Sequence, residues 1–444
     1  MLQKKILLIT YYWPPSGGPG VQRWLKMTKY LAQWGCDITV ITVKEEDASY
    51  PHLDRSLNDE VHQDIDVLRT SAFNPYRLIG KGGGQSALAV SDSKEKESKK
   101  PKFQWLPFIR SHIFIPDPRR GWNRAALKCA RKRMSEERFD ALITSSPPHS
   151  TQLIGYRLSQ EFAVPWIMDL RDPWTDIFYY SKLGHSKWSA AIDRKLEMKC
   201  LRQADQIMVV GNQLKQLVEE KLSIAADGLN GPVHVVSNGY DEADFTHIKA
   251  RAEKQEGFHV VYTGTLSAFY HYGPMFDAIR ECAALHPELT CTLYGAIPMD
   301  VKQDLVSHFE GVQFCSEVSH SEINAIQSQA DLLLLVIPQV PNDGLILTGK
   351  LFEYLRSGVP IMNLGPEDGD AAAILTECAA GQTFNRTQNE DMKSYLLAQI
   401  EAKAQGRNMS QARSKSVANY SRENLAKKVL EILGESEASV QSQG

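Results

Sequence analysis

The stretch Thr348-Gly-Lys-Leu-Phe-Glu-Tyr-Leu-Arg-Ser-Gly-Val-Pro360 predicts a short helix that is followed at once by a buried strand. Gly358 and Pro360 end the helix, because glycine readily adopts the left-handed conformation behind a helix and proline cannot continue one. Residues 359–364 are apolar enough for a short buried strand. A helix, a glycine-proline stop and a strand make half of an α/β unit.

Lys350 and Glu353 are three residues apart at the start of this helix, so they share one helical face. The first turn of a helix offers free N–H groups and the positive end of the dipole, so Lys350 suits a phosphate there. Glu353, one turn deeper, could accept hydrogen bonds from sugar hydroxyls. The alternative is an ordinary amphipathic helix with two solvated charges.

Length and composition favour a globular protein of two domains. The chain has 444 residues, an apolar fraction of 43%, a charged fraction of 23% and a net charge of −3, which gives no reason to expect nucleic-acid binding. Its seven cysteines form no C-x-x-C pair, so we expect neither a disulfide framework nor a zinc site, and a cytoplasmic location fits best. No signal peptide and no run of ~18 apolar residues is present, so we expect any membrane contact to be peripheral.

The first half of the chain reads as α/β structure with an interruption. Strand, glycine-rich turn, helix and strand follow one another over residues 5–43, and further strands are predicted at 141–145, 165–170 and 206–210. Between these sets, a glycine-rich and then highly charged stretch predicts a mobile insertion over about residues 79–120.

The second half alternates strands and helices regularly, which indicates a parallel sheet covered on both faces. The domain boundary is expected near residue 240, giving an N-terminal domain over 1–240 and a C-terminal domain over 241–415. The polar tail, 434–444, is expected to be disordered. The expected strands and helices are strand 258–263, helix 274–285, strand 289–294, helix 300–309, strand 312–315, helix 320–328 and strand 331–337.

The loop Pro14-Pro-Ser-Gly-Gly-Pro-Gly20 follows the first strand and precedes a helix. Parallel α/β sheets bind ligands at the carboxyl ends of their strands, so glycines here would let the backbone approach a phosphate or a sugar. A tight turn that serves only packing is the alternative. The loop is not a clean G-x-G-x-x-G, but Gly18-x-Gly20 with the acidic residues 45–46 after the second strand leaves an NAD-dependent oxidoreductase open.

The arrangement resembles the retaining glycosyltransferases of family 4, which have the GT-B architecture of two facing Rossmann-like, doubly wound α/β domains. The resemblance spans nearly the full chain. It rests on the glycine-rich loop, on Val235-Val-Ser-Asn-Gly-Tyr-Asp241, on Tyr262-Thr-Gly-Thr265 and above all on Gly349-Lys-Leu-Phe-Glu-Tyr-Leu-Arg-Ser-Gly-Val-Pro360. It also implies that a final helix, at 416–433, crosses back to the first domain.

The resemblance implies a donor site for a nucleotide diphosphate sugar. Glu353 would hold the ribose, and Lys350 would lie near the phosphates, as in a subgroup with a Lys-x-x-Glu-Tyr motif. Amides near Gly349 and Thr265 would also hold the diphosphate, and Gly264 would belong to the same donor site. Gly17 and Gly18 would close over the diphosphate. Residues Val318 to Ser321 would line the pocket for the base, and Val318 and Ser319 are the two that we assign to the site.

The chain also departs from the family pattern. The family's second glutamate, eight residues before the ribose glutamate, is replaced by Leu345, so contacts to the donor sugar cannot be carried over. The family's diphosphate-binding Arg and Lys align with Thr265 and about Tyr272. Lys350 is therefore expected to be the main positive charge on the phosphates.

In the first domain, candidate acceptor-side residues follow two adjacent strands. Pro165-Trp-Ile-Met-Asp-Leu-Arg-Asp-Pro-Trp174 has Arg171-Asp172 where the family often has His-Asp. Asp169 or Asp172 could orient an acceptor hydroxyl and Arg171 could bind an acidic group, the alternative being a strand-end ion pair. His149 ends the preceding segment, and its alternative is a structural histidine.

No Asp-x-Asp element follows a strand, so we expect no metal and no other cofactor. Residues 99–122 interleave cations with large apolar side chains, which suits an anionic membrane surface, and a loop with buried aromatics is the alternative. The expected function is transfer of a sugar, with retention, to a hydroxyl of a glycan or lipid-linked acceptor in surface polysaccharide or glycoconjugate biosynthesis. A GT-B epimerase or a non-catalytic nucleotide-sugar binding protein also stays open.

Overall fold

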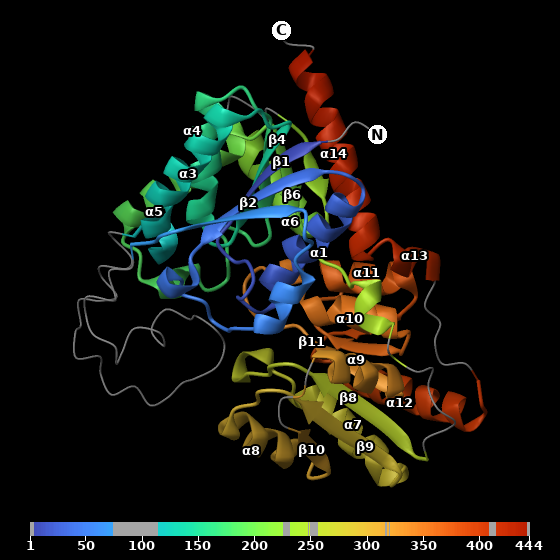
Figure 1. Ribbon diagram of the computed structural model, residues 1–444. Coiled ribbons are helices and arrows are strands. Elements are labelled where there is room, and N and C mark those ends of the chain that lie inside the picture. The colour runs from blue at the N-terminus through green and yellow to red at the C-terminus, as the bar shows by residue number, and fades with distance from the viewer. Residues whose placement is uncertain are drawn as a thin grey trace. The chain divides into compact units, whose positions relative to one another are not determined.

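The chain forms two compact units, each built on one parallel sheet (Figure 1). The computed structural model describes residues 4–73, 114–224, 231–246, 248, 256–315, 318, 320–407 and 414–441. Of these, residues up to 237 and from 422 onward belong to the first unit, and residues 238–421 belong to the second.

The sheet of the first unit has seven parallel strands in the order β3-β2-β1-β4-β5-β6-β7. The order reverses between β1 and β4, as in doubly wound α/β folds, so the carboxyl ends of these two strands flank the position where such folds bind ligands. The strands are β1 (Lys5–Thr10), β2 (Asp37–Val43), β3 (Ile65–Thr70), β4 (Ala141–Ser146), β5 (Trp166–Leu170), β6 (Gln206–Val209) and β7 (Val233–Val235).

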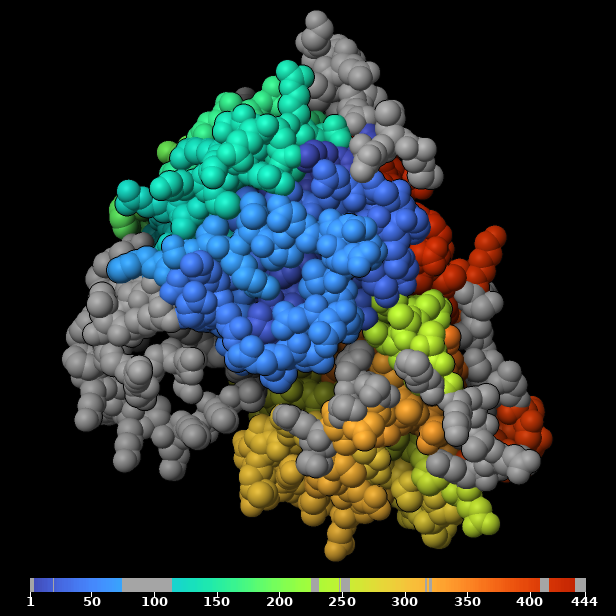
Figure 2. All heavy atoms as spheres, viewed as in Figure 1, coloured from blue at the N-terminus to red at the C-terminus, as the bar shows by residue number. Residues whose placement is uncertain are grey.

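Two helices from opposite ends of the chain cover one face of this sheet. Buried side chains of α1 (Pro19–Gln33) and α14 (Arg422–Gln441) share a core with alternate residues of the central strands, such as Leu8 and Ile143. On α14 these residues include Leu425 and Val429. The helices α3 (Asn123–Glu136), α4 (Gln152–Glu161), α5 (Lys187–Gln203) and α6 (Asn212–Ser223) pack side by side in that order. The segment between β2 and β3, in blue, forms much of the first unit's surface in Figure 2.

The second unit has a six-stranded parallel sheet in the order β10-β9-β8-β11-β12-β13. β11 reads Leu-Leu-Leu-Leu-Val and is buried along its whole length, as expected for a central strand covered on both faces. The strands are β8 (Phe258–Thr263), β9 (Leu289–Tyr294), β10 (Val312–Cys315), β11 (Leu332–Val336), β12 (Ile361–Leu364) and β13 (Gly381–Phe384).

Two separate cores flank this second sheet. One is formed with α7 (Gly273–Leu285), α8 (Met299–His308) and α12 (Asn389–Ala404). The other is formed with α10 (Gly349–Ser357), α11 (Asp370–Cys378) and α13 (Ser414–Ala418), and α9 (His320–Gln329) packs beside α10. Consequently α10 is fixed by its apolar face, and Lys350 in its first turn lies at the carboxyl end of β8.

The predicted fold class is confirmed, including a final helix that packs on the first unit. The expectation of a disordered tail from Gly434 is wrong up to Gln441, because α14 continues to that residue. A single glycine costs only about 1 kcal/mol in a helix, and the residues that follow include no proline and several good helix formers.

Residues 114–120 are also a correction, because the structure packs this part of the predicted mobile insertion against the first unit. Ile115 and Trp122 are buried, and the indole Nε1 of Trp122 donates a hydrogen bond to Thr70 Oγ1 at 2.7 Å. Arg120 Nη1 donates to the carbonyl of Ile115 at 2.6 Å. The remainder of the insertion, residues 79–113, lies outside the described residues.

Candidate functional site

Helix α10 presents Lys350 and Glu353 on its polar side. Its other side is buried through Leu351, Phe352, Tyr354 and Leu355, whereas Lys350 and Glu353 are partly exposed. The helix ends at Gly358, whose φ of 73° is left-handed, and Pro360 leads into β12. At its start, Thr348 caps the helix without a side-chain bond, and its buried Oγ1 has no hydrogen-bond partner among the described residues.

Lys350 lies over the end of β8. Its Nζ donates a hydrogen bond to the hydroxyl of Tyr262 at 2.7 Å and is 4.1 Å from the centroid of that ring. A Cβ placed on Gly264 would be 3.2 Å from Nζ, so the ammonium is directly above the backbone at this point. Burial lowers the pKa of Lys350 to about 7, and the nearby charge of Glu353 acts in the opposite direction.

Glu353 is oriented by a polar chain that starts on the neighbouring helix. Gln327 Nε2 in α9 donates to Glu353 Oε2 at 3.2 Å and to Thr263 Oγ1 at 3.1 Å. The N–H of Thr263 donates to the hydroxyl of Tyr354 at 3.0 Å. The carboxylate is therefore directed by side chains from α9 and β8 at the carboxyl edge of the sheet, and it remains partly exposed.

Glycines let the loops after β8 and β9 approach each other closely. Gly264 and Gly295 have φ values of 108° and 130°, and a Cβ on Gly295 would be 2.5 Å from the carbonyl oxygen of Gly264. The N–H of Gly264 already donates to the carbonyl of Tyr294 at 2.8 Å. The Gly264 amide is therefore bonded within the protein, and the assignment of Gly264 to the donor site stays a prediction. Thr265 and Gly349 stay partly exposed beside it.

The predicted base pocket is only partly described. Val318 lies between β10 and α9 and is half-buried. Ser319 lies outside the described residues. The structure therefore leaves this prediction as it stands.

In the first unit, the glycine-rich loop packs on residues 52–54. The N–H of Gly17 donates to the carbonyl of His52 at 3.0 Å, and a Cβ on Gly17 would be 2.4 Å from the His52 ring. The Gly17 amide is therefore bonded within the protein, and the prediction that Gly17 closes over a ligand stays a prediction. Gly18 is exposed, and its φ of 96° requires glycine.

Arg171 follows β5 and lies against the start of α1. Its Nε donates to the carbonyl of Ser146 at 3.1 Å and its Nη2 to that of Pro147 at 3.1 Å. A Cβ on Gly20 would be only 2.6 Å from Nη1, so Gly20 makes room for the guanidinium. Burial raises the pKa of the neighbouring Asp172, while Arg171 opposes this shift.

His149 lies at the carboxyl end of β4, stacked on Trp174. The ring centroids are 5.1 Å apart and the planes differ by 11°. Burial, together with the positive charge of Arg171, lowers the pKa of His149 to about 3, so the ring is neutral near pH 7. Its Nδ1 is buried and has no hydrogen-bond partner in the described part of the chain. A neutral imidazole donates one hydrogen bond and accepts one, and it carries no positive charge.

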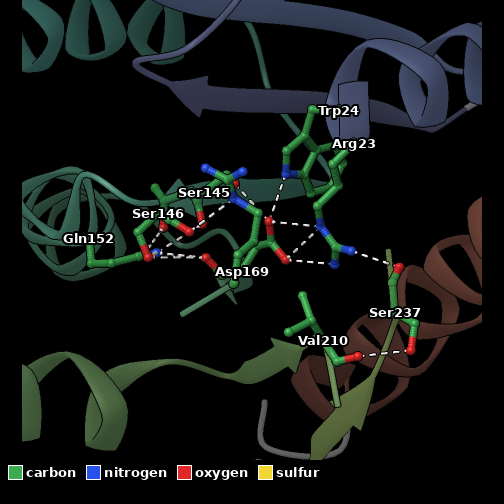
Figure 3. A network of polar contacts seen from close by, with 10 residues as sticks. Arg23, Trp24, Ser145, Ser146, Gln152, Asp169, Val210 and Ser237 are labelled. Carbon is green, nitrogen blue, oxygen red and sulfur yellow. Dashed lines mark hydrogen bonds and ion pairs between the residues drawn. The ribbon is translucent and has the colours of Figure 1, made fainter. Parts of the chain in front are cut away.

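Asp169 forms a buried ion pair, which corrects its assignment to the acceptor side (Figure 3). Arg23 Nη2 and Nε are 2.8 Å and 3.2 Å from Asp169 Oδ1. Trp24 Nε1 and Ser145 Oγ donate to Oδ2 at 2.8 Å and 2.7 Å. Arg23 and Asp169 are both fully buried, so this carboxylate is surrounded by protein donors and does not reach an acceptor.

The family model for glycosyltransferase family 4 matches residues 20–244, just over half of the chain. The chain belongs to glycosyltransferase family 4. No curated protein sequence matches this family 4 chain. Membership replaces the oxidoreductase alternative. The acidic residues 45–46 were the sign of a ribose site in an oxidoreductase. In the structure one of them has another partner, because Glu45 Oε2 is 3.3 Å from Arg55 Nη1.

Solved structures show the same fold at low sequence identity. The chain is similar to the sucrose-phosphate synthase of Thermosynechococcus elongatus, with 14% identity, coverage of 98% of this chain and 100% of the other, and a TM-score of 0.61. It is also similar to HepE of Anabaena in complex with UDP and glucose, with 14% identity, coverage of 98% and 100%, and a TM-score of 0.59. It is similar as well to the α,α-trehalose 6-phosphate synthase of Burkholderia multivorans, with 11% identity, coverage of 100% of this chain and 98% of the other, and a TM-score of 0.60.

Among the described residues of this glycosyltransferase, no group of three or more His, Cys, Asp or Glu is arranged to hold a metal ion. Within the same residues, no helix is long and apolar enough to span a membrane.

Sequence reasoning missed several residues that position the predicted ones. Tyr262 stands in the Tyr-Thr-Gly-Thr motif, but its contact with Lys350 joins residues 88 apart. Gln327 lies within the predicted helix 320–328, but the sequence alone gives no reason to assign a role to this residue. Trp174 was part of the Asp169 to Trp174 segment, and its indole Nε1 donates to Asp193 Oδ1 at 2.8 Å. The sequence did contain one sign of a role for Trp174, namely a large aromatic residue close to the charged residues that follow a strand.

Proposed function

We propose that this family 4 glycosyltransferase takes its sugar from a nucleotide diphosphate sugar held at the start of α10. The observation that carries the proposal is the placement of Lys350 Nζ above Gly264, with Glu353 one turn further along the same helix. Lys350 would stabilise the charge that develops on the leaving diphosphate. Glu353 would accept hydrogen bonds from the ribose. HepE, which shares the fold, has been solved with UDP-glucose, and this supports a nucleotide-sugar donor.

We assign the acceptor to the carboxyl edge of the first unit's sheet. Asp172 is a partly exposed carboxylate whose pKa burial raises, and within the described residues nothing donates a hydrogen bond to it. Such a group suits contact with an incoming hydroxyl. Arg171 is its neighbour in the chain, and the charge of Arg171 also acts on the neutral ring of His149. The acceptor class that we propose is a glycan or a lipid-linked sugar, in the cytoplasm, with the reaction contributing to surface polysaccharide or glycoconjugate synthesis.

Retention of the anomeric configuration is part of the proposal. A leaving phosphate that assists the incoming hydroxyl removes the need for a carboxylate nucleophile and its partner acid, which glycosidases require. The resemblance to retaining family 4 enzymes supports this route. Proton NMR of the freshly formed glycosidic bond tests it, and an inverted product would contradict it.

We also propose that no metal ion or other cofactor takes part. Lys350 supplies a positive charge at the place where a metal would otherwise neutralise the diphosphate. Activity should therefore persist in an excess of EDTA. Loss of activity in EDTA that Mg²⁺ or Mn²⁺ restores would contradict this part of the proposal.

Contact with an anionic membrane stays a proposal for residues 99–122, of which 99–113 lie outside the described residues. Flotation with phosphatidylglycerol vesicles tests it, with charge reversal at Lys99, Lys100 and Lys102. Equal flotation of the variant and the wild type would contradict it.

The main experiment is a panel of nucleotide sugars, with release of the free nucleotide diphosphate as the readout. The wild type should act on one donor, and Lys350→Ala should lose most of that activity. Analysis of the sugar product separates the remaining alternatives. An epimerised nucleotide sugar without transfer would indicate an epimerase, and binding without any turnover would indicate a non-catalytic protein.

A further inference from the structure

Tyr262 connects the cation of α10 to the loop that follows β8. Its side chain is 1% exposed. Its hydroxyl accepts a hydrogen bond from Lys350 Nζ and donates one to the carbonyl oxygen of Thr265, both at 2.7 Å. One phenol therefore holds a charged side chain and a loop in fixed relation.

The position of the ammonium depends on this phenol and on a missing side chain. Nζ lies above the backbone of Gly264, within 3.2 Å of where a Cβ would be. The Nζ is also 4.1 Å from the centre of the Tyr262 ring, a distance at which the ring face attracts a cation. Together the hydrogen bond and the ring hold the ammonium against β8.

Among the described residues, the acceptor of the Lys350 Nζ hydrogen bond is a neutral hydroxyl, that of Tyr262. The charge of Glu353, on the same helix, favours the charged form of Lys350 but does not offset the effect of burial. From β8 the facing group is Tyr262, which burial keeps neutral by raising its pKa well above the usual value. Tyr270 and Tyr354 act in turn on Tyr262. A cation held against a neutral phenol is incompletely stabilised until an anion arrives.

We propose that Tyr262 is a positioning residue that holds the ammonium of Lys350 over Gly264, so that binding of a sugar diphosphate there is accompanied by uptake of a proton by Lys350. The identity of the ligand rests on the proposed function. The position of Lys350 and its dependence on Tyr262 are instead argued from the contacts of these two residues.

The direction of the proton movement follows from the lowered pKa of Lys350, about 7 in the free protein. A diphosphate next to Nζ favours the charged amine, so the pKa rises in the complex. Above about pH 7 the free protein lacks this proton, which the buffer must supply on binding. The affinity for the donor should then fall by up to about tenfold per pH unit as the pH rises above 7.

The first test requires no ligand. The rate at which acetic anhydride acylates Lys350, followed by mass spectrometry against pH, reports the fraction of neutral amine. The wild type should show a midpoint near 7. In Tyr262→Phe the ammonium loses its acceptor and should move into water, so the midpoint should rise towards the ordinary lysine value. Tyr354→Phe is the matched control, because its hydroxyl bonds Thr263 instead of Lys350.

A wild-type midpoint near the ordinary value of about 10.4 overturns the proposal without any variant. A Tyr262→Phe midpoint that stays near 7 or falls also overturns it, provided that circular dichroism shows a folded chain.

The second test measures proton uptake on binding. Calorimetry with UDP-glucose near pH 8, in two buffers of different ionisation enthalpy, should give close to one proton for the wild type and none for Lys350→Met. Binding without proton uptake by the wild type would overturn the proposal. If UDP-, GDP- and ADP-sugars all fail to bind, the proposed function fails, and the acylation midpoints still decide the placement of Lys350.

Discussion

At the scale of single residues, the donor side depends on one cation and one carboxylate that the fold holds in place. Lys350 is held by Tyr262, and Glu353 is held by Gln327. Both supporting side chains come from elements other than α10. Their substitution should therefore alter the site without disturbing the helix that carries Lys350 and Glu353.

Glu353→Gln should weaken donor binding while leaving the fold intact. A charged hydrogen bond contributes about 1.5–3 kcal/mol, so the KM for the donor should rise about tenfold to a hundredfold. Glu353 is partly exposed, so the thermal midpoint should change little. Steady-state kinetics against donor concentration provides the measurement. Asp391→Asn, at an exposed position of α12, is the control. A KM equal to that of the wild type would exclude Glu353 from the donor site.

Asp169 should matter for stability instead of catalysis. Removing it in Asp169→Ala leaves the buried Arg23 charge without its partner, which costs about 3–5 kcal/mol. Replacing both residues, as in Arg23→Met with Asp169→Leu, should restore much of that loss. Urea unfolding of the single and double variants gives the coupling free energy. Additive losses would contradict the ion pair described here.

His149 should make stability depend on pH. Its pKa is lowered to about 3 in the fold, so between pH 6.5 and about 3 the unfolded chain binds a proton that the folded chain does not. Its contribution to stability is present above pH 6.5 and is lost as the pH falls through this range. His149→Gln should therefore lose less stability than the wild type between pH 7 and 5. Parallel urea curves at the two pH values test this, and identical losses would show that the ring titrates normally.

At the scale of elements, α14 is the clearest departure from expectation. The helix passes through Gly434, which is exposed and meets nothing within 4 Å of an added Cβ. Gly434→Ala should stabilise the first unit by about 0.5–1 kcal/mol, because alanine favours a helix over glycine. Gly184→Ala is the matched control. It also meets open space, but its φ of 73° makes alanine strained, so it should destabilise. No gain in Gly434→Ala, measured by urea unfolding, would show that α14 ends earlier.

Elements with a strong apolar pattern could be predicted from the sequence to the residue. β8 and β9 have the predicted bounds, because each is a short run whose burial pattern is nearly continuous or alternating. β10 also has the predicted bounds, although only its first residue is fully buried. Short or polar elements gave no such signal. β7 has three residues, and β13 reads Gly-Gln-Thr-Phe, so both depend on pairing with a neighbouring strand.

The site could be predicted only as far as local spacing reaches. Lys350 and Glu353 lie on one face because they are three residues apart, and that follows from the helix alone. The partners of Asp169 are 146, 145 and 24 residues away, and only the folded sheet brings them together. For the same reason the sequence offered Asp169 and Asp172 as equals, although one is buried in an ion pair and the other is partly exposed.

At the scale of the whole molecule, the two units divide the candidate chemistry between them. The second unit carries the proposed donor residues on α10 and β8, and the first carries Arg171, Asp172 and His149 at the ends of β4 and β5. After the last residue of the second unit, the chain returns to the first unit as α14. In the function that we propose, the acceptor residues belong to the first unit and the donor residues belong to the second.

The most direct test of the central claim is calorimetric titration of the full chain with UDP-, GDP- and ADP-sugars, repeated with Lys350→Ala and Glu353→Gln. We predict that the wild type binds one of these donors and that each variant binds it at least about tenfold more weakly, with thermal midpoints close to the wild type. Wild-type affinity retained in both variants, or no binding of any nucleotide sugar to the wild type, would contradict the account.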